Sequence, residues 1–431
     1  MTRAVSRQAY EVHAPGLQFS LETLRGALLW LAGLSGAFVF VEPSPYEFAS
    51  LLAIFVFAAT GLALAPALMP LLILLVLYNI GFAVAVIPVL HQGKPLVWVL
   101  VSAYLSATAL FFAAALGRNT SARLSLILRG YMTAAVLAAL AGIAGYFRLL
   151  PGSDLFVLYD RARGTFNDPN VLGAFLVLPI LLAFQRVLAG RLSESLRGCA
   201  VLLVLVAALL LSFSRGAWAQ LALSAVVLMA LTFITTRSRR ERLRIVLFAV
   251  AGAVASAAFV VALLSIEQVG ELFKERATLE QSYDVGHGGR FGRHLLGLAM
   301  VLDHPLGLGP LQFRTFFPED PHNAFLNAFA SGGWLSGFSY LAITITTLVM
   351  GLRVALWPAP WRAPFLALYA AYVGIVAESA VIDSDHWRHG FLVVGALWGL
   401  MAATQLHRAV SRSGLNAPAA RALGVVRPTY R

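Results

Sequence analysis

The chain has 431 residues, of which 59% are hydrophobic and 12% are Asp, Glu, Lys or Arg, and its mean hydropathy is +0.80. A soluble protein needs more polar surface than this, so the composition excludes a soluble enzyme, a disordered chain and a secreted disulfide scaffold. The single cysteine, Cys199, excludes an intrachain disulfide and a CxxC metal site, and the net charge of +12 raises the question of whether that charge lies on one side of a membrane.

The apolar residues are gathered in long stretches. A membrane-spanning helix needs about 20 mostly apolar residues, and about twelve stretches of this chain approach that length. The sequence therefore predicts an all-α polytopic membrane protein of about 12 transmembrane helices with one long helical loop. The predicted spans are residues 24–41, 47–65, 67–90, 96–116, 125–147, 170–188, 198–213, 217–235, 244–265, 324–350, 364–382 and 389–406.

The charges indicate how these spans are oriented. With twelve spans both termini lie on one side, and roughly two thirds of the 32 Lys and Arg residues fall there, which the positive-inside rule assigns to the cytoplasm. The basic run at residues 237–244 is then a topology signal, and no nucleic-acid partner is expected. The predicted domains are a cytoplasmic N-terminus (1–23), transmembrane helices 1–9 (24–265), an outer loop with amphipathic helices (266–323), transmembrane helices 10–12 (324–406) and a cytoplasmic Arg-rich tail (407–431).

Few polar residues remain for the opposite side, the predicted outer face. The connection before the sixth predicted span contains Arg161, Arg163 and the pair Asp168-Pro169. Asp168-Pro169 is typical of an N-cap followed by proline at the first helical position. Cations alone are unfavourable at a helix N-terminus, so Arg161 and Arg163 are better explained as part of an anion site that uses the positive end of the helix.

Arg215 lies between the seventh and eighth predicted spans with almost no loop around it. It falls on the face that the positive-inside rule keeps poor in arginine. An arginine at the centre of a span costs about 2.5–3.5 kcal/mol on insertion scales, and less near the interface. The residue is therefore either a functional cation with a partner or an interfacial side chain that reaches lipid phosphate.

The outer loop is longer than an ordinary connection, which indicates a function or a structure of its own. Residues 266–279 predict an amphipathic helix on the membrane surface. A second helix is predicted over residues 290–302, where Arg290 and His294 share one face.

The loop ends in Glu319-Asp320-Pro321-His322-Asn323, directly before the tenth predicted span. A histidine beside two carboxylates at the membrane surface suits a general base. A polar N-terminal cap provided by His322 and Asn323 is an equal alternative.

The last outer connection carries Asp383, Asp385, His386 and His389. Carboxylates and imidazoles are suitable ligands for a divalent metal, although the spacing matches no strong metal motif. The favoured interpretation is that Asp385 pairs with Arg388 and closes the outer end of the helix bundle.

Several outer arginines beside one candidate base suit a phosphate-bearing lipid head group. Three segments of the chain resemble the family of O-antigen ligases and O-antigen polymerases, which are polytopic inner-membrane proteins of bacteria. Their order and spacing match over about residues 150–340. The segments are Arg161-x-Arg163-Gly164-Thr165-Phe166-x-x-Pro169-Asn170, then Ser212-x-Ser214-Arg215-Gly216-Ala217, and then the loop from Gly289-Arg290 through Asp303-His304-Pro305-Leu306-Gly307-Leu308-Gly309 to Pro321-His322-Asn323-Ala324-Phe325-Leu326.

The resemblance implies a GT-C-type glycosyltransferase that acts at the periplasmic face of the inner membrane, with an undecaprenyl-pyrophosphate-linked glycan as donor. It implies that His322 activates the acceptor hydroxyl and that outer arginines bind the pyrophosphate. These arginines are Arg215 and Arg290, with either Arg161 or Arg163. Residues expected to support them are Asp320, Arg293, Asp385 and Arg388, and Arg293 or Arg314 competes with Arg290 for its role.

The resemblance also implies inversion at the anomeric carbon without a metal or cofactor, because arginines can neutralise the charge that develops on the pyrophosphate. The favoured reaction is ligase-like transfer to lipid A-core in lipopolysaccharide synthesis, and an O-antigen or exopolysaccharide polymerase is the close alternative. A transporter or flippase would share the hydropathy, but it predicts charges near the bilayer midplane, and here they lie at one surface. The expected partners are the lipid-linked donor, a lipid A-core or glycan acceptor, and the bilayer.

Overall fold

The computed structural model describes residues 20–149, 151–189, 192–267, 270–271 and 289–412. Its regular structure is helical apart from a hairpin of two short antiparallel strands, β1 (Val157–Leu158) and β2 (Arg161–Ala162). The helices before the long loop are α1 (Leu21–Ser35), α2 (Pro45–Ala59), α3 (Met69–Ala85), α4 (Lys94–Ala115), α5 (Thr120–Tyr146), α6 (Pro169–Ala189), α7 (Leu192–Leu211), α8 (Arg215–Thr235) and α9 (Arg239–Leu264). The later helices are α11 (Arg290–Asp303), α12 (Ala324–Ala355), α13 (Arg362–Glu378) and α14 (Arg388–Arg412). Short 3-10 helices are η1 (Pro66–Leu68), η2 (Ile87–Gln92), η3 (Ser153–Phe156) and η4 (Phe313–Thr315).

Each predicted span overlaps one α-helix, but the predicted count of twelve spans is not confirmed. Among the described residues, eight helices are long and apolar enough to cross a membrane. They are η1 continued by α3, and α4, α5, α6, α7, α8, α12 and α14. Helices α1 and α2 have 15 residues each and α13 has 17, which is fewer than the about 20 residues of a typical span.

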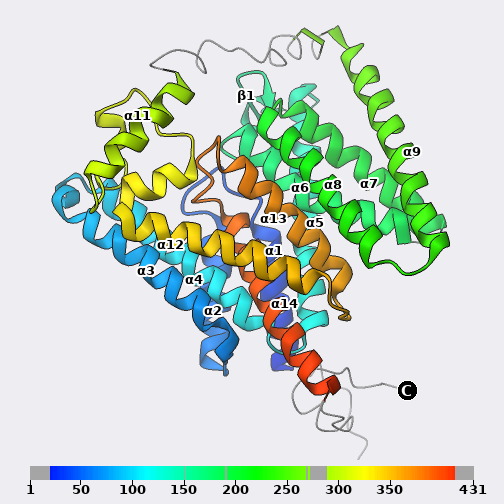
Figure 1. Cartoon of the computed structure of the whole chain (residues 1–431). Coiled ribbons are helices and arrows are strands. Elements are labelled where there is room, and N and C mark those ends of the chain that lie inside the picture. Colours follow the sequence, from blue (N-terminus) through cyan, green and yellow to red (C-terminus); the bar gives the residue numbers. More distant parts are fainter. Residues whose placement is uncertain (1–19, 150, 190–191, 268–269, 272–288, 413–431) are drawn as a thin grey trace, which may run out of the picture.

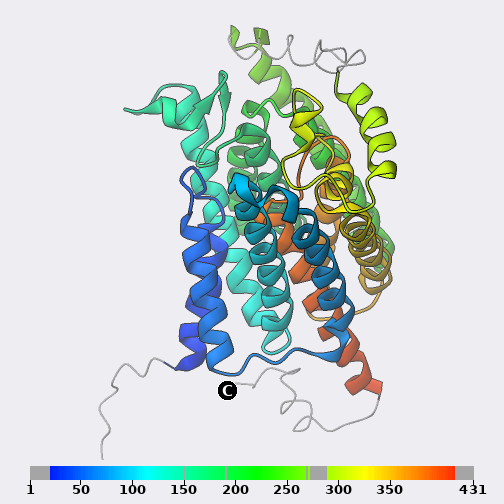
Figure 2. The same ribbon diagram turned by 90° about the vertical axis from the view of Figure 1, so that its left-hand side faces the viewer.

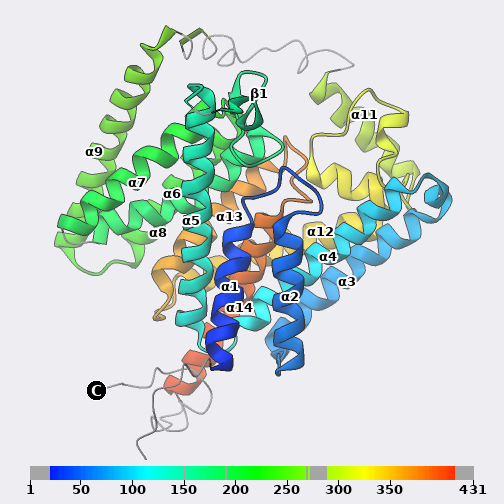
Figure 3. The same cartoon turned by 180° about the vertical axis from the view of Figure 1, so that it is seen from behind.

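Figures 2 and 3 show the helices packed side by side from two directions. Helix α14 packs against α4, α12 and α13. Trp398 of α14 is fully buried, and its Nε1 donates a hydrogen bond to Oγ1 of Thr347 in α12 (2.8 Å). Gly395 of α14 lies so close to α4 that a Cβ there would be 2.3 Å from the carbonyl oxygen of Ala109. Other close pairs are α1 with α5, α3 with α12, α6 with α7 and α8 with α13.

The connections that carry the candidate site residues meet at one end of this bundle, the upper end in Figures 1 and 2. Hydrogen bonds join them across long sequence separations. For example, the Val39 amide donates to Thr165 O (3.1 Å). We call this end the loop face and define it by residues 36–44, 147–168, 212–214, 304–323 and 379–387.

Helix α12 is kinked at Gly333, where φ is +69°. A Cβ at this position would also lie 2.4 Å from Pro305 O, so both the conformation and the close approach require glycine. The kink separates a short first part, residues 324–332, from the longer part that packs on α3. Helix α11 packs on the first part around a small core of Val301, Phe313, Leu326 and Ala330.

Two local predictions are confirmed. Helix α6 begins at Pro169, and Oδ1 of Asp168 accepts the backbone N–H of Asn170 (2.6 Å), as expected for a helix cap. The helix predicted over residues 290–302 is α11. The amphipathic helix predicted over residues 266–279 lies largely outside the described residues, as do most of the N-terminal segment 1–23 and of the tail 407–431.

Candidate functional site

Arg215 is the first residue of α8, directly after the tight turn at residues 212–214. Ser214 caps this helix, because its Oγ accepts the backbone N–H of Ala217 (3.3 Å). Arg215 is partly exposed. Arg215 therefore lies at the positive end of α8, a position that favours an anion at the loop face.

Arg161 lies beneath this turn and is only 9% exposed. Its Nε donates to Ser212 O (2.7 Å), and a terminal nitrogen donates to Oδ1 of Asn170 (2.6 Å). Arg163 is partly exposed, and its Nε donates to Leu155 O (3.2 Å). Arg161 thus shapes the turn that carries Arg215, whereas Arg163 is the more accessible of the two cations.

Two consecutive residues at the end of α13 connect the start of α8 with the start of α12. Glu378 packs so closely on Gly216 that a Cβ there would lie 2.5 Å from Oε1 of Glu378. The next residue, Ser379, accepts the backbone N–H of Ala324 at its carbonyl oxygen (2.8 Å). The first turns of α8 and α12 therefore both contact the end of α13, which brings the Arg215 segment and the His322 segment to one part of the loop face.

His322 lies in the turn before α12, with a φ of +51° that is rare for a residue other than glycine. Asp383 holds this turn, because its Oδ2 accepts the His322 amide (3.1 Å) and its Oδ1 accepts the Asn323 amide (3.0 Å). The same Oδ2 lies 3.4 Å from Nδ1 of His322, whose side chain is 35% exposed. One carboxylate thus fixes the backbone and faces one nitrogen of an accessible imidazole. A strained backbone of this kind is common where a side chain must be held for function.

The N-terminal cap of α12 is Asn323, whose Oδ1 accepts the Leu326 amide (3.0 Å). The predicted polar cap of this helix is therefore present, and Asn323 provides it. Burial, together with the negative charges of Asp385 and Asp320, raises the pKa of Asp383 to about 7, although the two backbone N–H groups act to lower it.

The segment that carries His322 is held by α11. Buried Arg293 donates to Oε2 of Glu319 (2.8 Å), and Nε2 of His294 lies 2.8 Å from Pro321 O. Oε2 of Glu319 is also 3.6 Å from Nε2 of His322. The carboxylate of Glu319 therefore lies between Arg293 and His322 and links the two side chains.

Asp320 and Arg290 have different positions in this segment. Asp320, two residues before His322, forms an ion pair with Arg314. Arg290 is the first residue of α11, and its side chain lies outside what the structure describes.

The predicted pairing of Asp385 with Arg388 is wrong. Nε of Arg388 donates to Oε1 of Glu47 (2.7 Å), and a terminal nitrogen donates to Oε1 of Glu42 (3.1 Å), because the start of α14 packs against the start of α2. Asp385 is buried and accepts a hydrogen bond from the side-chain amide of Asn327 (3.0 Å). Arg388 therefore ties α14 to α2, and Asp385 ties the 379–387 connection to α12.

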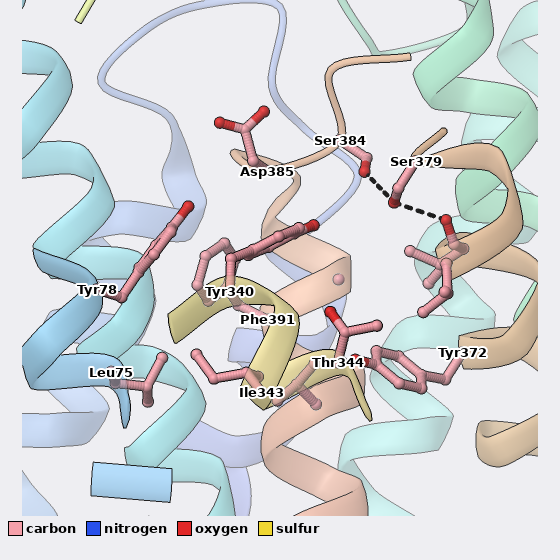
Figure 4. A pocket seen from close by; sticks show the side chains of 14 residues that line it. Leu75, Tyr78, Tyr340, Ile343, Thr344, Tyr372, Ser379, Ser384, Asp385 and Phe391 are labelled. Carbon is pink, nitrogen blue, oxygen red and sulfur yellow. Dashed lines mark hydrogen bonds between the residues drawn. The ribbon is translucent and has the colours of Figure 1, made fainter. Parts of the chain in front are cut away.

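Asp385 lies at one end of a partly open cavity of about 50 Å³ below the loop face, shown in Figure 4. Such a volume holds about three water molecules and is too small for a sugar ring. The polar and aromatic side chains that line the cavity include Tyr78, Tyr340, Thr344, Tyr372, Ser379 and Ser384.

The alternative of a metal site at residues 383–389 has no geometric support in the described part of the chain. No group of three or more His, Cys, Asp and Glu side chains there is placed to hold a metal ion. Asp383 accepts backbone amides, and His389 is buried and stacked on Trp387 with ring centroids 5.1 Å apart.

A comparison with protein families supplies the identification. Residues 200–341 match the family model of O-antigen ligase, Wzy_C. This stretch is an O-antigen ligase domain. It contains Arg215, Arg290 and His322, whereas Arg161 and Asp383 lie outside it. The family covers both ligases and polymerases, and no curated protein matches the chain.

Sequence reasoning assigned no role at this site to two residues that the O-antigen ligase domain contacts. Asp383 was predicted only as one member of an alternative metal cluster, and its contact with the histidine turn has no local signal. Glu378 is 4% exposed, and neither carboxylate oxygen has a hydrogen-bond partner among the described residues. A lone Glu at the end of an apolar stretch is the only sequence signal that marks it.

Proposed function

We propose that this protein is a glycosyltransferase of the ligase type, which moves a glycan from undecaprenyl pyrophosphate to a hydroxyl of lipid A-core. We place the loop face at the periplasmic side of the bacterial inner membrane and both termini in the cytoplasm. The support for this orientation is the excess of Lys and Arg on the side of the termini.

The observation that carries the proposal is the arrangement around His322. An accessible imidazole lies 3.4 Å from the carboxylate of Asp383, and Glu378 and Ser379 connect its turn with the helix that begins at Arg215. A base held by a carboxylate next to an arginine at a helix N-terminus suits an acceptor hydroxyl beside a phosphate leaving group.

In the proposed reaction, Nε2 of His322 takes the proton of the acceptor hydroxyl. The acceptor oxygen forms a bond to the anomeric carbon as the bond from that carbon to the phosphate oxygen breaks, so the configuration inverts. Undecaprenyl pyrophosphate leaves with the electron pair, and Arg215 neutralises its charge together with Arg163 and Arg290. The negative charge of Asp383 stabilises the imidazolium. Glu319 lies near Nε2 but is 55% exposed, so it can yield this position to the acceptor.

A reconstituted assay tests the assignment and the acceptor together. Purified protein in proteoliposomes receives undecaprenyl-pyrophosphate-linked glycan, either alone or with lipid A-core, and the glycolipid products are separated on gels. We expect capped lipid A-core only in the mixture that contains it, at a rate that EDTA leaves unchanged. Extension of the donor by itself would identify a polymerase. Donor that is consumed in neither mixture would contradict a glycosyltransferase.

A further inference from the structure

Helix α11 has an apolar face that no described part of the protein covers. Its buried side is formed by Arg293, Gly297 and Val301. On the opposite side, Leu295, Leu298 and Leu302 are 74%, 55% and 62% exposed. These leucines are spaced at i, i+3 and i+7, so they form one stripe along the helix. A helix whose outer side faced water would carry polar residues in this stripe.

The stripe lies beside exposed apolar residues at the ends of two candidate membrane spans (Figure 1). Directly after the kink, α12 exposes Trp334 and Phe338, and the end of α3 is followed by exposed Ile87. Nε1 of Trp334 donates to Val301 O in α11 (3.0 Å), so this tryptophan joins the span to the helix. Tryptophan is enriched where the hydrocarbon core of a bilayer meets water. Figure 1 shows α11 at the edge of the molecule, beside the loop-face ends of α3 and α12.

We propose that Leu295, Leu298 and Leu302 are immersed in the lipid leaflet at the loop face, and that α11 is an interfacial helix that lies on the membrane. Lipid fits this surface because Trp334 joins α11 to the exposed apolar face of α12, a candidate membrane span. A second protein copy fits it less well, since one row of leucines is far smaller than the roughly 800 Å² that each partner of a standard interface buries.

The anchored helix also holds the candidate base. Arg293 and His294 of α11 contact Glu319 and Pro321, which directly precede His322. The depth of α11 in the leaflet therefore determines how far the imidazole of His322 lies from the plane of the lipid phosphates. The importance of this distance for the reaction rests on the proposed function. The membrane contact itself does not depend on that function.

Fluorescence quenching in nanodiscs that hold one protein copy tests the contact without any activity measurement. Cys199, which is exposed, is first replaced by serine. A fluorophore is then attached to Leu302→Cys or to its matched neighbour Asp303→Cys, which is also exposed but lies outside the stripe. Leu298→Cys repeats the measurement one turn earlier, in case one substitution disturbs the fold.

We expect nitroxide-labelled lipids to quench the fluorophore at positions 302 and 298 about twofold more than at 303, because an interfacial helix buries its apolar face about 5–10 Å deep. Aqueous iodide should show the reverse order. Equal quenching by iodide at all three positions would overturn the proposal. A separate sample tests a second protein copy: unlabelled Leu302→Cys is oxidised in proteoliposomes that hold many copies. Disulfide cross-linking there, together with no lipid quenching in the nanodiscs, would assign the stripe to a second protein copy and would also overturn the proposal.

Discussion

Nδ1 of His322 lies 3.4 Å from Oδ2 of Asp383, and the same carboxylate accepts the backbone N–H groups of His322 and Asn323. A single side chain thus controls both the position of the turn and the environment of the imidazole. This relationship distinguishes His322 from His304 in the same loop, whose Nδ1 lies 2.8 Å from Met300 O and whose side chain is exposed.

Asp383→Asn should slow glycan transfer by about 100-fold or more, because the substitution keeps the size of the side chain but removes the charge that stabilises the imidazolium. Initial rates at saturating donor in proteoliposomes measure the effect. Asp303→Asn, at the exposed end of α11, is the matched control and should transfer at the wild-type rate. An Asp383→Asn rate equal to that of the control would remove Asp383 from the mechanism.

The transfer rate should rise with pH through about 7. Burial raises the pKa of Asp383 to about 7, and the proposed role needs the ionised carboxylate. The rate at saturating substrates, measured from pH 5 to 9, should therefore contain a step near neutrality that is absent in Asp383→Asn. Identical pH profiles for the two proteins would show that Asp383 does not govern the rate.

Thermal stability should change with pH in the opposite direction. The folded protein binds a proton at Asp383 up to about pH 7, whereas the carboxyl in the unfolded chain ionises near 3.8. The contribution of Asp383 to the free energy of unfolding is therefore largest below about pH 4 and is lost as the pH rises to about 7. Melting curves in detergent should show that the melting temperature of the wild type falls, relative to that of Asp383→Asn, as the pH rises from about 4 to about 7. A difference that grows in the other direction would contradict the raised pKa.

Arg161 and Arg215 should respond differently to substitution. Arg161→Ala removes buried hydrogen bonds to Ser212 O and Asn170, so it should lower the free energy of unfolding by about 2–3 kcal/mol. Arg215→Ala should leave the melting temperature nearly unchanged and abolish transfer. Thermal unfolding and transfer assays on both variants separate the two roles. Loss of stability in Arg215→Ala with transfer preserved would reverse this assignment.

Gly333→Ala should loosen the loop face, because a Cβ at φ +69° would be strained and would lie 2.4 Å from Pro305 O. Strain of this kind costs about 1–3 kcal/mol before the clash is counted. Limited proteolysis should cleave the 289–323 segment faster in this variant than in the wild type. The control is Gly252→Ala, where the nearest atom would be an ordinary contact at 3.9 Å. Equal cleavage of the two variants would show that alanine can adopt the kinked conformation at position 333.

The features that could be predicted from the sequence are those determined by residues close together along the chain. The cap at Asp168, the helix that begins at Arg290 and the position of Arg215 between two apolar stretches all follow from local patterns. Hydropathy predicted where helices lie but not how many are long enough to span. For example, the capping box of Ser44 and Glu47 starts α2 near the predicted boundary, but the helix ends after only 15 residues.

The contacts across the fold could not be predicted. Asp383 is 61 residues from His322, and Glu47 is 341 residues from Arg388. Both pairs form because α2, α12 and α14 come together at the loop face. A single sequence does not indicate which helices are neighbours in the fold. The short spacing of Asp385 and Arg388 suggested a local pair instead, and tertiary packing gave each residue another partner.

The most direct test of the central claim is the transfer rate of His322→Ala under conditions in which donor binding is intact. Binding of the lipid-linked donor is measured first, and single-turnover transfer to lipid A-core follows in the same proteoliposomes, with His304→Ala as the matched control. The proposed mechanism predicts that His322→Ala binds the donor normally and forms no capped product, whereas His304→Ala transfers at the wild-type rate. Product formation by His322→Ala at the wild-type rate would contradict the role of His322 as the general base.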